Sequence, residues 1–199
     1  MTNEANNIHR SDDVPQPILS EASLPDELIE TGLRAFATLV QIIGTSTKTN
    51  DKIEALTHYF STADDKDKVW MIAIFSGRRP KRMVNSSQLS EWCVEMAQLP
   101  GWLFGECYHT VGDLGETISL LLPEPNINPA DVPMPLHYYI EQFIRLEKQD
   151  EAIRKKFILD SWNKMDQREC FVFNTPPSVS GKTARGLFRL VEVDLPYIF

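Results

Sequence analysis

A short basic run carries the most suggestive chemistry in this 199-residue chain. Residues 77–82 read Gly-Arg-Arg-Pro-Lys-Arg, with four positive charges and no negative one. Arginine forks onto phosphate oxygens through paired hydrogen bonds, and the central proline stiffens the loop, so that less conformational entropy is lost on ordering it. Two interpretations stay open: a phosphate contact, and a solvated surface loop. The charged residues are Arg78, Arg79, Lys81 and Arg82.

Catalytic and metal-binding motifs are not found. Gly181-Lys182-Thr183 resembles the end of a nucleotide-binding loop, but that motif needs glycine where Pro176 stands. There is no Gly-x-Ser-x-Gly sequence for a serine nucleophile. The scattered histidines form no metal-binding pair. We therefore predict no catalytic residue, no metal site and no cofactor for this stretch of sequence. The histidines are His9, His58, His109 and His137.

Three cysteines, odd in number and without a Cys-x-x-Cys pair, argue against a disulfide framework and against a zinc site. Cys93 and Cys107 lie on apolar helical faces, which indicates small core residues. The third is Cys170.

Charge is distributed unevenly. The net charge is −8, but residues 1–31 hold seven acidic residues and one arginine, so the rest of the chain is close to neutral. Local field rather than total charge decides where a polyanion docks, so the acidic total does not exclude nucleic acid. No apolar run is long enough for a membrane span, and the first residues do not resemble a signal peptide. We expect a cytoplasmic protein without membrane contact.

Two further polar segments could meet phosphate. Residues 102–123 read as two helices that meet at Gly112, and a second glycine follows at Gly115. Either the two glycines allow close helix packing, or the backbone amides around them face a phosphate. Residues 45–50, a hydroxyl-rich bridge, are expected to cap the helix that follows them.

Hydrophobic periodicity predicts that helices position these segments. We expect an all-α domain over residues 25–174, an acidic disordered tail over 1–24, and an atypical tail over 175–199. In the helix at 64–75 we expect Val69, Ile72, Ala73 and Trp70 to face inward. Residues 170–173 suggest either a strand or the start of a helix. The helices are predicted at residues 26–43 (ended by Gly44), through 53–60, at 64–75, from 85 through 96, on either side of 112, at 136–147 and at 150–165.

Several of these motifs occur together in an order that resembles one protein family. Between residues 36 and 174 the chain is similar to the N-terminal DNA-binding domain of bacterial ATP-dependent DNA ligases. The motifs are STKTNDKIEAL at 46–56, SGRRPKR at 76–82, LPGWLF at 99–104, ECY at 106–108 and VGDLGET at 111–117.

The resemblance implies an all-helical domain that grips the backbone of nicked double-stranded DNA, largely without reading sequence, in repair, replication and recombination. It implies phosphate contacts for the four basic residues of the 77–82 run and a close approach of DNA at Gly112. Thr47 and Lys52 are further candidates for DNA contact.

The resemblance stops after Asn174. Full-length relatives continue into a domain whose Lys-x-Asp-Gly lysine takes AMP from ATP with Mg²⁺, and this sequence contains no Lys-x-Asp-Gly. We therefore expect a truncated ligase that cannot seal nicks by itself, because no lysine is available to form the covalent adenylate. Two alternatives stay open: the non-catalytic subunit of a split ligase with a separately encoded catalytic domain, and a helical protein-interaction module.

Overall fold

The structure is a computed structural model that describes residues 30–76, 84–126 and 134–175. Within these ranges the chain forms nine α-helices and no strand, which confirms the all-α prediction. The helices are α1 (Gly32–Thr45), α2 (Thr49–Thr62), α3 (Asp65–Phe75), α4 (Ser86–Ala97), α5 (Gly101–Val111), α6 (Leu114–Leu121), α7 (Leu136–Leu146), α8 (Glu151–Trp162) and α9 (Gln167–Asn174).

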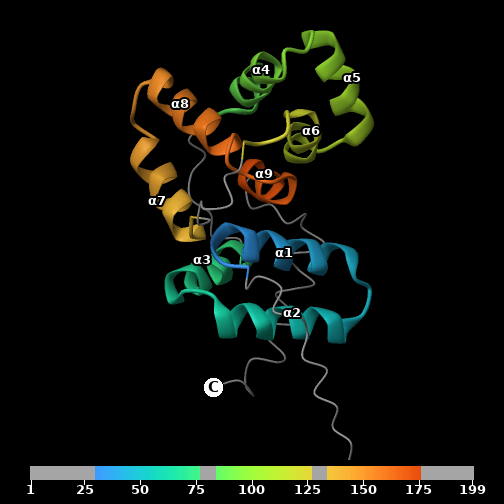
Figure 1. The fold of residues 1–199 in the computed structure, drawn as a ribbon, viewed down its shortest axis with the longest axis vertical. Coiled ribbons are helices and arrows are strands. Elements are labelled where there is room, and N and C mark those ends of the chain that lie inside the picture. The colour runs from blue at the N-terminus through green and yellow to red at the C-terminus, as the bar shows by residue number, and fades with distance from the viewer. Residues whose placement is uncertain (1–29, 77–83, 127–133, 176–199) are drawn as a thin grey trace, which may run out of the picture.

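The short helix α9 lies at the centre of the arrangement (Figure 1). It packs between α6 on one side and α1 on the other. Below it, α1 and α2 lie side by side, with α3 next to them, and above it stand α4, α5 and α6. Helices α7 and α8 close one flank, where α7 contacts α3 and α8 contacts α4.

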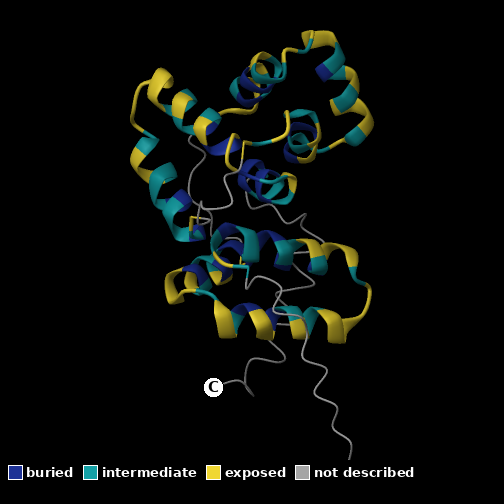
Figure 2. Ribbon diagram, viewed as in Figure 1, coloured by how far each residue is buried: buried dark blue, intermediate teal, exposed yellow. Residues whose placement is uncertain are grey.

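The helices form two groups on either side of α9, with α1, α2 and α3 in one and α4, α5 and α6 in the other. Buried side chains gather where these two groups face α9. Figure 2 shows buried segments on the inward sides of α1, α4, α6 and α9. Met71, Cys93 and Ile118 have no exposed surface at all, and Phe173 of α9 contacts three other aromatic rings. Burying such apolar side chains supplies most of the favourable free energy of folding. One continuous core therefore joins both groups of helices.

A buried carboxylate ties α3 to α7. Asp67 of α3 is 1% exposed, and its oxygens accept hydrogen bonds from the backbone N–H groups of Leu136 (3.1 Å) and His137 (2.8 Å). The same carboxylate also accepts a 2.7 Å bond from Nδ1 of His137. The residue before α7 is Pro135, which provides no side-chain cap. Asp67, a residue of α3, therefore caps the N-terminus of α7.

A second polar network joins α1 to α9. Arg34 of α1 lies 3.3 Å from the Glu169 carboxylate, and Arg168 of α9 lies 3.2 Å from Glu30. Burial raises the pKa of Glu169, while a backbone hydrogen bond at Asp166 and the nearby Arg34 charge oppose that effect. These pairs orient α9 across α1.

The bounds of α1 differ from the prediction. The helix begins at Gly32 because Thr31 is extended and Gly32 has a positive φ of 65°, which interrupts any helical path from earlier residues. It also continues past Gly44 to Thr45. Gly44 therefore lies inside the helix and does not end it.

The inward face of α3 was predicted only in part: Trp70 packs half-buried against the core, but two of the other residues expected to face inward are exposed. Val69 is 65% exposed and Ile72 is 40% exposed, while Met71, Ile74 and Phe75 are buried. Residues 69–75 are all apolar, so periodicity did not fix which face turns inward. Ile153 in α8 is another large apolar residue that is exposed, at 47%.

Residues 170–173 belong to a helix, which decides between the two interpretations of this segment. The Asp166 side chain accepts a bond from the Glu169 backbone, and the Glu169 side chain accepts one from the Asp166 backbone. This capping box fixes the start of α9. Asn174 ends the helix buried, accepting a 2.9 Å bond from the Trp162 indole.

None of the helices in the described ranges has the length and apolar character that a membrane crossing requires. The tails predicted over residues 1–24 and 175–199 lie outside those ranges except for Thr175, so both stay predictions.

Candidate nucleic-acid interface

The basic run lies outside the described residues. Arg78, Arg79, Lys81 and Arg82 all fall within residues 77–83, between Ser76 at the end of α3 and Val84 before α4. Val84 is buried, and α4 begins with a capping box made by Asn85 and Gln88. The run therefore connects α3, from one group of helices, to α4, from the other.

The connection between α1 and α2 is polar and exposed. Thr47 is exposed, Lys52 is half-buried in the first turn of α2, and Lys48 is the N-cap residue. Ser46 Oγ accepts a 3.1 Å bond from the Lys48 N–H and donates a 2.7 Å bond to the Asp51 carboxylate. These bonds hold the turn but leave the start of α2 without a side-chain cap.

This open helix end corrects the expectation that residues 45–50 cap α2. Two of the hydroxyl groups form hydrogen bonds with other partners. Thr45 donates to the Gln41 carbonyl in the preceding helix, and Ser46 donates to the Asp51 carboxylate. The first amides of a helix carry partial positive charge and bind anions when no side chain occupies them. The missing cap therefore leaves a site that suits a phosphate group.

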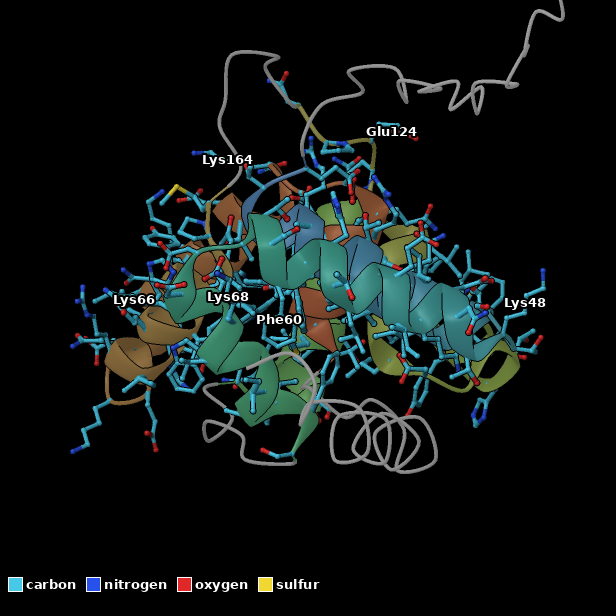
Figure 3. All side chains as sticks on the ribbon, turned by 90° about the horizontal axis from the view of Figure 1, so that it is seen from below. Lys48, Phe60, Lys66, Lys68, Glu124 and Lys164 are labelled. Atoms are coloured by element: carbon cyan, nitrogen blue, oxygen red, sulfur yellow. The ribbon has the colours of Figure 1, made fainter. Side chains whose placement is uncertain are left out.

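Two lysines flank the open end of α2. Among the residues that the structure describes, neither Lys48 nor Lys52 has an ion-pair partner. Figure 3 places Lys48 at one extremity of α2, on the opposite side of the view from Lys66 and Lys68. The sequence interpretation did not include Lys48 among the candidate DNA contacts. Lysine at the N-cap position, where a capping side chain is usual, was the signal that could have indicated it.

The turn between α5 and α6 depends on Gly112. Its φ of 81° is left-handed, it is exposed, and a Cβ placed there would meet nothing within 4 Å. Glycine is present for its backbone geometry, as expected at the residue that ends a helix. Close helix packing is therefore not what Gly112 provides.

The amide of Gly112 is already used. Its N–H donates a 2.9 Å bond to the Tyr108 carbonyl, and the next helix is capped by Asp113, which accepts from the Glu116 N–H at 2.9 Å. Gly112 therefore exposes a stretch of backbone without a side chain, which another molecule can approach closely. The close approach of DNA there stays a prediction.

Gly115 has a different role. A Cβ at this buried position would lie 2.8 Å from the backbone nitrogen of Thr175, closer than real contacts allow. Glycine is thus required for α6 to pack against the end of α9. Of the two glycines, Gly115 is the one that packing explains.

A groove brings two of the candidate segments together. It runs between α1, α6 and α9 with a volume of about 710 Å³, and its lining includes Thr45 from one segment and Asp113 and Glu116 from the other. Ile74, in the last turn of α3, also lines it, three residues before the basic run begins. Two of the candidate segments therefore border one groove, and the helix that leads into the third lines it as well.

Acidic side chains also lie near these segments. Asp51, Asp113 and Glu116 sit in or beside the two described turns. A polyanion would need compensating positive charge, which Lys48, Lys52 and the basic run carry. Within the described ranges, no group of three or more His, Cys, Asp or Glu residues is placed to hold a metal ion.

Comparison with known proteins decides the family. A family model described as "DNA ligase N terminus" matches residues 33–175, more than half of the chain. The chain belongs to the family of ATP-dependent DNA ligase N-terminal domains. No curated protein and no solved structure matches it. The matched span includes every helix described in this ligase domain except the first residue of α1, and it ends one residue after α9.

Proposed function

We propose that this ligase domain grips the sugar-phosphate backbone of nicked duplex DNA, largely independently of sequence, during repair, replication or recombination. Membership of the ligase family carries the proposal, since it gives a DNA-related role in general. The open N-terminus of α2 supports phosphate contact, because its first amides lack a capping side chain and lie beside Lys48 and Lys52. The basic run would add four further charges.

Backbone contact rather than base reading fits the donors available. Phosphate contacts come from Lys, Arg, hydroxyl groups and helix N-termini, and the candidate segments offer these types. Thr47 and Thr49 provide hydroxyls at the start of α2, and Lys48 provides an amine. These groups fix a protein on a duplex without reading its sequence.

The experiment that tests the proposal is binding of the intact chain to a labelled nicked duplex, before and after Arg78, Arg79, Lys81 and Arg82 are changed to Gln. We expect affinity to fall by at least about 100-fold at low salt, because each lost phosphate contact removes a released counterion.

The matched control changes the same number of charges elsewhere. Lys66, Lys148, Lys156 and Lys164 are exposed and lie outside the candidate segments. Changing these four to Gln should leave affinity within about threefold, since they neutralise no phosphate. Equal losses in both variants would mean that general charge, not this interface, holds the DNA. No loss in the first variant would favour a helical module that does not bind DNA through this run.

A further inference from the structure

The groove between α1, α6 and α9 is wide and largely apolar at its base. Phe36 and Ile74 lie buried at its floor, while Val40 and Val172 are half-buried in its walls. Leu120 of α6 lines the groove and is 52% exposed. Apolar side chains gathered along one groove suit contact with an apolar segment that covers them.

The chain leaves the ligase domain at the rim of this groove. Thr175, the last described residue, is part of the lining. Its backbone packs so closely on α6 that a Cβ at Gly115 would lie 3.1 Å from Thr175 Cα. Whatever follows Thr175 therefore starts at the groove that Leu120 also lines.

The sequence beyond Thr175 has two parts. Residues 176–186 are rich in small and polar residues and prolines, and nine of the 13 residues in 187–199 are apolar. Val191, Val193 and Leu195 alternate with Glu192 and Asp194, the spacing that places three apolar side chains on one face of an extended segment. Eleven residues span up to about 36 Å, enough for a return to the groove.

We propose that residues 187–199 of the same chain occupy this groove, with Val191, Val193 and Leu195 against its apolar floor. Attachment through a short linker holds the segment at a millimolar-range effective concentration, which favours it over a second copy or a separate protein. Each side carries two acidic residues and one arginine: Arg189 of the segment can pair with Asp113 or Glu116 of the lining, and Arg168 of the lining can pair with Glu192 or Asp194. The inference concerns the groove alone and does not depend on DNA binding.

A photo-crosslink tests the proposal directly in the full-length chain. Leu120 is replaced by p-benzoylphenylalanine, and peptides joined after illumination are identified by mass spectrometry. The expected product is a crosslink within one chain to residues 187–199. A crosslink between two chains, a crosslink to any other segment, or no crosslink at all would overturn the proposal.

The matched control carries the same photoreactive residue at Ile144. This side chain is 51% exposed, like Leu120, but lies on α7 and outside the groove lining. It should give no crosslink to residues 187–199. Equal crosslinking from both positions would show non-specific contact by the segment and would also overturn the proposal.

A double-substitution cycle measures the same contact without a probe. Leu120→Glu and Val193→Glu should each raise the unfolding equilibrium constant about tenfold, because each places a charge in an apolar contact. Together they should raise it by little more than either alone, since both break one contact. Fully additive effects, or no effect of Val193→Glu, would contradict the docking. Ile144→Glu combined with Val193→Glu should be additive.

Discussion

The first backbone amides of a helix have no partner within the helix, and two helices in this domain treat them in opposite ways. The start of α7 is buried, and its first amides are held by Asp67, a carboxylate from α3. The start of α2 is exposed, lacks a side-chain cap and is flanked by Lys48 and Lys52. Unpaired amides at a helix start need a partner in either case. Where the protein provides the partner the helix end stabilises the fold, and where it does not the end is open to an anion.

The largest expected effect comes from removing the internal partner of α7. Asp67→Ala should lower the free energy of unfolding by about 3 kcal/mol, because two buried amides and the His137 ring lose a charged acceptor. Urea unfolding followed by circular dichroism measures this. Asp65→Ala is the control: its side chain is 95% exposed, so a change within about 0.5 kcal/mol is expected. If both substitutions lowered the free energy of unfolding by a similar small amount, Asp67 would not be the partner that stabilises the start of α7.

Gly112 tests whether the α5–α6 turn is held by backbone geometry. Gly112→Ala should cost about 1–2 kcal/mol, since an L-residue resists the left-handed conformation although space for the methyl group is free. Gly105→Ala, also in open space but inside α5, should instead stabilise by about 0.5–1 kcal/mol. Thermal unfolding distinguishes the two signs. The same sign for both substitutions would rule out the geometric explanation.

Lys48→Asp should change the stability of the fold and its affinity for DNA in opposite directions. An aspartate at the N-cap should stabilise the fold by about 0.5–1 kcal/mol, because it accepts from a first-turn amide. It should weaken binding to nicked DNA about tenfold, because it fills the site and reverses one charge. Calorimetry and fluorescence anisotropy measure the two effects.

Lys66→Asp makes the same charge change at the start of α3, which Asp64 already caps. Neither stability nor DNA affinity should change appreciably there. If Lys48→Asp left DNA affinity unaltered, the open end of α2 would not be a phosphate site.

The smallest expected effect is that of Lys52→Gln. Loss of one phosphate contact should reduce the slope of log affinity against log salt by about 0.9. Anisotropy titrations over a series of salt concentrations measure it. An unchanged slope would remove Lys52 from the interface and restrict the open site to Lys48 and the first amides of α2.

Sequence reasoning succeeded where local signals determined the structure. Asn85 and Gln88 marked the start of α4, and Gly112 marked the break between α5 and α6. It also indicated the family, which the match over residues 33–175 confirms. The segment at 170–173 carried a readable signal too, since Asp166 and Glu169 have capping-box spacing.

Long-range contacts explain what the sequence did not reveal. Nothing near Asp67 indicates that it caps a helix about 70 residues later, so a charged residue in the buried face of α3 was not predicted. The role of Gly115 depends on Thr175, which reaches α6 only after the chain folds. Among the predicted DNA-contact residues, the structure describes Thr47, Lys52 and Gly112, and Arg78, Arg79, Lys81 and Arg82 stay predictions from the sequence.

The most direct test of the central claim is the salt dependence of binding between the intact chain and a nicked duplex. Four phosphate contacts from the basic run alone give a slope of log affinity against log salt of about −3 to −4, and contacts at the start of α2 make it steeper. We expect a slope at least this steep. A flat response to salt would contradict it.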